Sequence, residues 1–274
     1  MNPFPQTSLV DGIAVDAFPD TQALFQRILH EIDRPGSSIV GYVNVHVANT
    51  AFRLPELKAF LRRASVVYCD GAGIVWGSRL LGEPPLPTRL TAADWLFELW
   101  DVLAQANKTV YFLGGSPGVA ERAVGRYLQQ QQTEQATARP CPVVGVHHGY
   151  IGQNPELEAS VLQEIERLKP DVLFVGMGTP AQERWILKNR QRLNVPVIYP
   201  IGAVADFLAG EVSRCPAWMG AVGLEWLYRL WVEPKRMFGR YVVGNPWFLA
   251  RISLQALQRH WLPTPAPKPT QTLG

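Results

Sequence analysis

The chain has 274 residues, 47% of them hydrophobic, which suffices for one large domain or for one domain with an appendage. Its formal net charge of +3 by itself indicates no particular partner, nucleic acid included. No charged N-terminal region precedes an apolar core, and no apolar run approaches the ~20 residues that span a bilayer. We therefore expect neither a signal peptide nor a transmembrane helix.

Charged and aromatic residues are distributed unevenly. From Arg214 to Gly274 there are eight Lys or Arg and two Glu, so this section carries +6 and the rest of the chain −3. It also holds five of the nine tryptophans. The three cysteines, Cys69, Cys141 and Cys215, are widely spaced, and we expect reduced thiols in a cytosolic compartment.

Residues 1–18 show no regular pattern and are expected to form an irregular lead-in. After them, short runs of branched apolar residues alternate with stretches of helical spacing. The expected strands are residues 39–47, 64–70, 108–113, 142–146, 172–175 and 195–199. The expected helices are residues 21–32, 55–63, 74–81, 92–106, 119–132, 155–168 and one that begins at Pro180.

This alternation predicts a doubly wound α/β domain, a Rossmann-like parallel sheet with helices on both faces. We expect this core to span 1–210, a basic, Trp-rich helical appendage to span 211–262, and the proline-rich tail 263–274 to be disordered. Ligands of such sheets bind outside the carboxyl ends of the strands. The residues expected there are Asn44, Asp70, Gly114, Gly115, Gly176, Gly178 and Gly202.

The stretch 172–185 reads as a buried strand, a tight turn with two glycines and a helix. Thr179 suits the N-cap and Pro180 the first helical position. The exposed N–H groups and dipole of such a helix start favour a phosphate. Gln182 could hydrogen-bond a substrate, and Glu183 sits where a carboxylate suits the dipole. An ordinary tight turn is the alternative.

Asp70 ends an expected strand and is followed by Gly71 and Gly73. A carboxylate in this position can act as a base toward a bound hydroxyl. It can equally cap the following helix, and the sequence leaves both open. Arg89 follows a proline-rich loop and suits bidentate binding of phosphate, although a solvated surface arginine is the alternative.

Other polar residues give weaker signals. Asn44 and His46 are expected on one face of a strand end, where His46 could also be a core histidine. His147 and His148 are read as a polar loop, and neither a metal motif nor an Asp-x-Asp sequence is present. A nucleoside diphosphate would therefore have to be bound by arginines and helix N-termini.

Two further features bear on function. The sequence from Gly176 to Ala181 fits the loose dinucleotide fingerprint Gly-x-Gly-x-x-Ala, but the next expected strand ends without the acid that binds ribose, which disfavours an oxidoreductase. In the C-terminal section, Leu224, Leu227 and Leu230 share a helical face. This face suits a membrane surface and lipid phosphates, and packing on the core is the alternative.

Taken together, these stretches resemble the WecG/TagA/CpsF family of bacterial glycosyltransferases from about residue 39 to about 248. The motifs that carry the resemblance are Asp70-Gly-Ala-Gly73, Arg89-Leu-Thr-Ala-Ala-Asp94, Phe112-Leu-Gly-Gly115, Gly149-Tyr150, Val175-Gly-Met-Gly-Thr-Pro-Ala-Gln-Glu183, Asp206-Phe-Leu-Ala-Gly210 and Gly223-Leu-Glu-Trp-Leu-Tyr-Arg-Leu230 with Glu233-Pro234. Their order and spacing are specific.

The resemblance implies transfer of a sugar from a UDP-sugar to a polyprenyl-diphosphate-linked sugar in cell-surface polysaccharide synthesis. In the TagA branch the sugar is N-acetylmannosamine and the acceptor is undecaprenyl-diphosphate-linked N-acetylglucosamine. Transfer inverts the anomeric centre and requires neither a metal nor another cofactor. The enzyme is implied to be cytoplasmic and peripherally attached to an anionic surface, the inner face of the bacterial plasma membrane.

The resemblance also implies roles for single residues. Asp70 is the base, Arg89 contacts the diphosphate, and arginines of the appendage contact the lipid diphosphate. With the residues identified above, the predicted substrate-binding set is Asn44, Gly71, Gly73, Gly114, Gly115, Gly176, Gly178, Gln182, Glu183, Arg229, Arg236 and Arg240.

The sequence departs from the family pattern near the predicted site. Ala92-Ala93-Asp94 stands where the family often has Gly-x-Asp, and Val43 stands where a Thr commonly precedes the first-strand Asn, so the donor sugar is not determined. An NAD(P)-dependent oxidoreductase and a non-catalytic membrane-associated binding module remain as alternatives. A homo-oligomer that buries the C-terminal aromatics is also left open.

Overall fold

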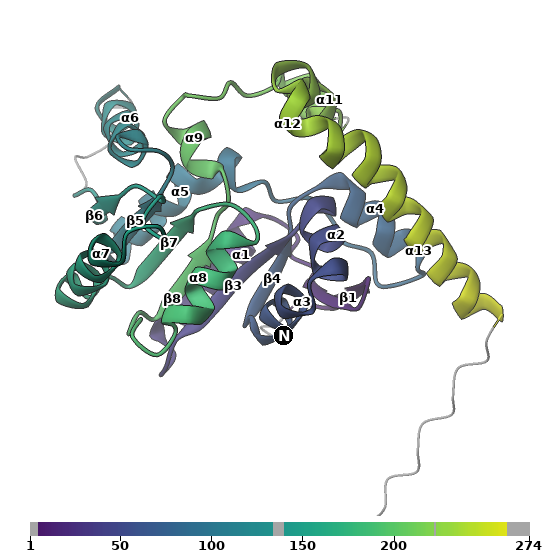
Figure 1. Ribbon diagram of the computed structural model, residues 1–274, viewed down its shortest axis with the longest axis horizontal. Helices are drawn as coiled ribbons and strands as arrows, with labels where there is room; N and C mark the ends of the chain where they lie inside the picture. The colour runs from purple at the N-terminus through teal and green to yellow at the C-terminus, as the bar shows by residue number, and fades with distance from the viewer. Residues whose placement is uncertain (1–4, 134–139, 222, 262–274) are drawn as a thin grey trace, which may run out of the picture.

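The computed structural model describes residues 5–133, 140–221 and 223–261 (Figure 1). In this part of the chain, eight strands form one sheet in the order β1-β2-β4-β3-β8-β7-β5-β6. All neighbouring pairs are parallel except β1 and β2. The strands are β1 (Thr7–Val10), β2 (Ile13–Asp16), β3 (Ser38–Val43), β4 (Val66–Cys69), β5 (Val110–Gly114), β6 (Val143–His147), β7 (Val172–Gly176) and β8 (Val197–Pro200).

Helices cover both faces of the sheet, and a separate apolar cluster lies under each layer. One layer comprises α1 (Thr21–Asp33), α5 (Ala92–Gln105), α6 (Val119–Thr133) and α9 (Val204–Leu208). The other comprises α2 (Val45–Arg53), α3 (Pro55–Arg63), α4 (Ala72–Leu80), α7 (Pro155–Leu168) and α8 (Ala181–Asn189). The predicted Rossmann-like α/β fold is thus confirmed.

The winding of the sheet reverses between β3 and β8. From β3 the chain continues to β4 on one side, whereas β5 to β8 fill the other side. Loops that leave the two neighbouring strands in opposite directions open a crevice at their carboxyl ends. The fold therefore predicts a ligand site beyond the ends of β3 and β8.

The prediction of an irregular lead-in is wrong, because β1 and β2 form an antiparallel hairpin. Asp11 and Gly12 connect them, and both have positive φ, at 53° and 74°. An Asp-Gly pair between two short alternating strands is a strong hairpin signal. The sequence therefore contained the signal for this hairpin, although each of its strands has only four residues.

The expected strand 39–47 is too long. β3 ends at Val43, and Asn44 caps α2 by accepting a hydrogen bond from the N–H of Val47 at 3.0 Å. Asn44 and His46 consequently do not lie on one face of a strand. The predicted start of α8 is also wrong, because the helix begins at Ala181 with Pro180 as its N-cap and without a side-chain cap.

The regular secondary structure of the described chain after β8 is helical. It comprises α9, α10 (Ala217–Ala221), α11 (Glu225–Val232), α12 (Pro234–Phe238), the π-helix η1 (Gly239–Val243) and α13 (Gly244–Trp261). α13 runs along α2 and α4 and buries Phe248 and Ile252 completely (Figure 1). Arg251 pairs with Asp11 at 2.7 Å, with both side chains at most 6% exposed.

α13 thus packs on the core, although the two alternatives were stated for the face of Leu224, Leu227 and Leu230. In contrast, α11 has no buried residue, and Trp231 is 86% exposed. None of the described helices is long and apolar enough to cross a membrane. The tail 263–274, predicted to be disordered, lies outside the described residues.

Candidate functional site

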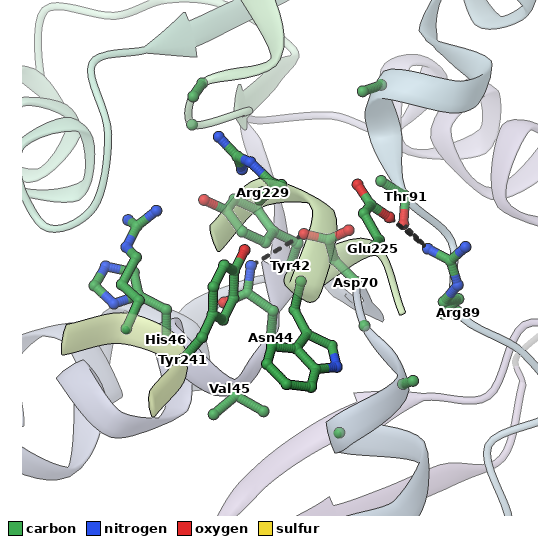
Figure 2. Close-up of a pocket in the computed structure, with 18 of the residues that line it drawn as sticks. Tyr42, Asn44, Val45, His46, Asp70, Arg89, Thr91, Glu225, Arg229 and Tyr241 are labelled. Carbon is green, nitrogen blue, oxygen red and sulfur yellow. Dashed lines mark hydrogen bonds and ion pairs between the residues drawn. The ribbon is translucent and has the colours of Figure 1, made fainter. Parts of the chain in front are cut away.

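A cavity of about 270 Å³ opens at the carboxyl ends of β3, β4 and β8, where the winding reverses. The α/β core contributes Tyr42, Asn44, His46, Asp70, Gly71, Gly73, Arg89, Thr91, Gly178 and Gly202. The C-terminal helices contribute Glu225, Trp226, Arg229, Arg236, Arg240 and Tyr241. Figure 2 labels Glu225, Arg229 and Tyr241 among them. The cavity is thus built jointly by the predicted core and the predicted appendage.

Asp70 lies in this cavity at the end of β4 (Figure 2). Its backbone N–H donates to the carbonyl of Val43 at 2.9 Å, which continues the pairing of β3 and β4. The capping alternative is wrong, because Gly71 is the N-cap of α4 and no side chain caps that helix. The Asp70 carboxylate therefore lines the cavity and does not cap α4.

Burial raises the pKa of Asp70 from 3.8 to about 7. Hydrogen bonds from Asn44 and Thr91 and the charge of Arg89 lower this pKa, whereas the carboxylate of Glu225 raises it. A carboxylate with a pKa near neutrality is matched to proton abstraction at physiological pH. A carboxylate with this position and pKa can accept a proton from a hydroxyl bound in the cavity.

Asn44 connects the first turn of α2 to Asp70. Its Oδ1 accepts from the N–H of Val47, and its Nδ2 donates to Oδ2 of Asp70 at 3.1 Å. Because the cap fixes which end of the amide faces the helix, the NH₂ group must point to Asp70.

His46 also lines the cavity, and burial, aided by the charge of Arg240, lowers the pKa of His46 to about 4. Its imidazole is therefore neutral at pH 7.

The predicted glycines divide into two groups. Gly71, Gly73 and Gly178 line the cavity, whereas Gly114, Gly115 and Gly176 do not. A Cβ on Gly73 would lie 2.4 Å from Cγ2 of Val45, so this glycine lets α4 approach the start of α2. A Cβ on Gly114 would lie 3.0 Å from Cα of Gly176, which gives these two glycines a packing role between β5 and β7.

Gln182 and Glu183 lie outside the cavity lining. Gln182 is fully buried; its Oε1 accepts from the N–H of Gly202 at 2.9 Å, and its Nε2 donates to Glu183 at 2.9 Å. The expected bond from Gln182 to a substrate is thus replaced by bonds that hold the loop after β8. Thr179, expected to cap α8, instead donates to Glu183 at 2.9 Å.

Arg89 lines the cavity, but internal partners already engage its guanidinium. Nη1 donates to Oγ1 of Thr91 at 2.9 Å and to Oε2 of Glu225 at 3.0 Å. Nη2 donates to the carbonyl of Gly220 at 2.8 Å. Two of these three partners belong to the C-terminal helices, so Arg89 joins them to the core.

The predicted arginines of the appendage all face the cavity. Arg229 and Arg236 share Glu233 as ion-pair partner, at 3.1 and 2.9 Å, and Arg229 also lies over the ring of Phe207. Arg240 forms no hydrogen bond or ion pair within the described chain. Burial lowers the pKa of Arg240 without removing its charge. An unpaired, half-buried guanidinium is suited to an anionic ligand.

Sequence reasoning missed Glu225 and Arg214 as cavity residues. Glu225 lies within a motif that carries the family resemblance, and it is one of only two acids in a section with eight basic residues. The rarity of acidic residues in this basic section was the signal that could have singled out Glu225. The described residues contain no group of three or more His, Cys, Asp or Glu able to hold a metal ion.

Comparison with known proteins supports a common ancestry for nearly the whole described chain. The sequence model described as "Glycosyl transferase WecG/TagA/CpsF family" matches residues 8–261. Two proteins of Staphylococcus aureus, from strains MRSA252 and NCTC 8325 / PS 47, are each 30% identical over 210 residues, which cover 77% of this chain and 77% of theirs. Both are named N-acetylglucosaminyldiphosphoundecaprenol N-acetyl-beta-D-mannosaminyltransferase.

Proposed function

The chain belongs to the WecG/TagA/CpsF family and is thus a glycosyltransferase, and on this premise we propose its donor, acceptor and mechanism. The proposed donor is a UDP-sugar with an N-acetylmannosamine-like sugar. The proposed acceptor is a polyprenyl-diphosphate-linked sugar, as in the names of the two similar proteins from Staphylococcus aureus. Family membership favours glycosyl transfer over the oxidoreductase and the non-catalytic binding module.

The observation that carries the proposal is that Asp70, with a pKa of about 7, lines the same cavity as Arg229, Arg236 and Arg240. An acceptor hydroxyl bound against Asp70 attacks the anomeric carbon while the carboxylate takes its proton. The new glycosidic bond forms as the bond to the UDP oxygen breaks, and UDP leaves with the electron pair. Attack opposite the leaving group inverts the anomeric centre.

The leaving diphosphate requires positive charge that is already in place. Arg229, Arg236 and Arg240 supply it in this proposal, and Arg240 is the best suited because its guanidinium has no partner in the described chain. Asn44 orients the Asp70 carboxylate through its 3.1 Å hydrogen bond. Since guanidinium groups can stabilise a diphosphate leaving group, we propose that the reaction proceeds without a metal.

Attachment to an anionic membrane surface is part of the proposal. Exposed apolar side chains follow the C-terminal helices, with Trp218 64%, Trp231 86% and Phe238 56% exposed. Basic side chains lie on the same helices, including Lys235 and Arg236. Such a combination suits a helix that lies in a membrane interface, where the lipid-linked acceptor resides.

The test is sugar transfer in vitro. The protein is incubated with UDP-sugars and a short-chain polyprenyl-diphosphate N-acetylglucosamine acceptor, with and without EDTA, and product and anomeric configuration are determined by mass spectrometry and NMR. We expect transfer with inversion that survives EDTA. Asp70→Asn should reduce kcat by about 10²–10⁴-fold, the usual contribution of a general base.

A matched control is Asp33→Asn, because Asp33 is 66% exposed and pairs with Lys108 on the surface. It should retain wild-type turnover. Stabilisation by NAD(P) but not by UDP in thermal melts, together with no transfer from any UDP-sugar, would contradict the proposed donor.

A further inference from the structure

Glu225, the first residue of α11, lines the cavity and forms ion pairs that link the C-terminal helices to the core. Its Oε2 accepts from Nη1 of Arg89 at 3.0 Å, and its Oε1 accepts from Nη1 of Arg214 at 2.9 Å. Arg89 also bonds the carbonyl of Gly220, and Arg214 also pairs with Asp94 in the first turn of α5. We refer to Arg89, Asp94, Arg214 and Glu225 as the clasp.

The clasp joins parts of the chain that are far apart in sequence. Arg89 precedes α5, Arg214 precedes α10, and Glu225 begins α11. Because each carboxylate oxygen has its own guanidinium, the start of α11 is fixed in position and rotation. Trp226 and Arg229 follow on α11 and line the cavity. Building on the proposed function, we infer that Glu225, held by Arg89 and Arg214, is a positioning residue for glycosyl transfer.

The clasp also acts on the base. Figure 2 shows Glu225 between Asp70 and Arg89. Burial is the main cause of the raised pKa of Asp70; Glu225 raises this pKa further and Arg89 lowers it. The titratable and charged groups that act on or lie beside Asp70 in the described chain are Tyr42, Tyr68, Cys69, Arg89, Tyr199, Glu225 and Tyr241.

The pKa values of those tyrosines and of Cys69 are raised by burial, so these groups are neutral near pH 7. Arg214, Arg229, Arg236 and Arg240 also line the cavity, but the formal charges that shift the pKa of Asp70 are those of Glu225 and Arg89, which have opposite signs. The clasp therefore places one anion and one cation beside the base. Removal of either charge should move the titration of Asp70 in a direction that depends on which was removed.

A role in stability alone is the competing explanation. The side chains of Glu225 and Arg89 are 20% and 23% exposed, and that of Arg214 is 31% exposed. Ion pairs that water reaches contribute little to folding. The clasp is therefore better placed to fix geometry at the cavity than to stabilise the fold. It also gives Arg89 a role in docking α11, apart from the diphosphate contact expected from the sequence.

The experiment compares Glu225→Gln and Arg89→Gln with the wild type in the transfer assay, after circular dichroism and thermal melts have verified folding. Both variants should lose about 10- to 100-fold in kcat, the size of effect expected when a cavity wall shifts by about 1 Å. The acidic limb of the kcat profile, which follows deprotonation of Asp70, should move to lower pH in Glu225→Gln and to higher pH in Arg89→Gln.

The matched control is Glu211→Gln. Glu211 pairs with Arg122 at 2.8 Å, both side chains are about half exposed, and neither lines the cavity. This variant should keep the wild-type kcat and acidic limb. The inference is overturned if Glu225→Gln stays within about twofold of the wild-type kcat, or if kcat falls in the two clasp variants without opposite shifts of the acidic limb.

Failure of the proposed function is recognised separately, because the wild type itself would then transfer no sugar. In that case the clasp is tested by NMR titration of the Asp70 carboxyl carbon in the wild type, Glu225→Gln and Arg89→Gln, with Asp70→Asn to assign the signal. Opposite displacements of the Asp70 pKa in the two variants would support the clasp. Identical titrations in all three proteins would refute it.

Discussion

Replacement of Asp70 by Asn should reduce kcat by about 10²–10⁴-fold and at the same time stabilise the fold at neutral and alkaline pH. The folded protein holds the pKa of Asp70 at about 7, whereas the unfolded chain ionises it near 3.8. Between these pH values the folded state binds the proton more tightly, so the contribution of Asp70 to stability declines as pH rises from about 4 to about 7. Asn carries no charge and avoids this loss.

The size of the effect follows from the same pKa difference. The interval from 3.8 to about 7 corresponds to about 4 kcal/mol of free energy of unfolding. Because Asp70 faces a cavity that water can enter, and because a neutral amide must also be desolvated, we expect about half of this, ~2 kcal/mol. For a protein of this size that raises Tm by about 4–8 °C.

The assay is thermal or urea unfolding of Asp70→Asn and the wild type from pH 4 to 8.5, with the Asp33→Asn variant as control. The stability difference should be near zero at pH 4, should grow up to about pH 7 and should then stay constant. A difference that is independent of pH, or a variant less stable than the wild type at pH 8, would refute the idea that burial raises the pKa of Asp70.

Three further predictions concern the core and the cavity wall. Arg251→Ala should reduce the free energy of unfolding by about 3–5 kcal/mol in urea titrations, because it leaves Asp11 as a buried unpaired charge. The double variant Asp11→Asn/Arg251→Met should recover part of this loss, and no recovery would contradict the reasoning. Gln182→Ala should cost about 1–3 kcal/mol, because the buried N–H of Gly202 loses its acceptor, and unchanged stability would mean that water replaces the side chain. Arg240→Gln should weaken UDP binding by about 10- to 100-fold in calorimetry, the value of a charge-assisted hydrogen bond, and equal affinities would remove this residue from the diphosphate site.

Most of the sheet could be predicted from the sequence because each buried strand is a short, nearly continuous apolar run. The strand at 172–176 is one example, with every residue buried. The errors occurred where local signals are short or compete. Asn44 follows an apolar strand directly, and the sequence alone did not reveal that it ends the strand and caps a helix. The hairpin before residue 18 has only four residues in each strand.

Asp70 could be predicted from sequence because its position depends only on where one strand ends. Its basicity could not, since the raised pKa comes first from burial and then from Glu225, which follows 155 positions later in the chain. Likewise, Gln182 lies at the expected place, but its partner is the N–H of Gly202 in a loop that follows another strand. Whether Gln182 is buried and bonded in this way depends on the loop after β8, which its own local sequence does not specify.

The sequence by itself thus determined the α/β alternation, the family and the edge of the sheet at which the site lies, because these depend on local periodicity and motif order. Only the tertiary structure decided which of the candidate residues face the cavity. The physical reason is that the C-terminal helices close over the ends of β3, β4 and β8, and bring Glu225 and the arginines within reach of residues more than 100 positions earlier. Charges that are distant in sequence become neighbours there, and their mutual effects follow from spatial distance and burial.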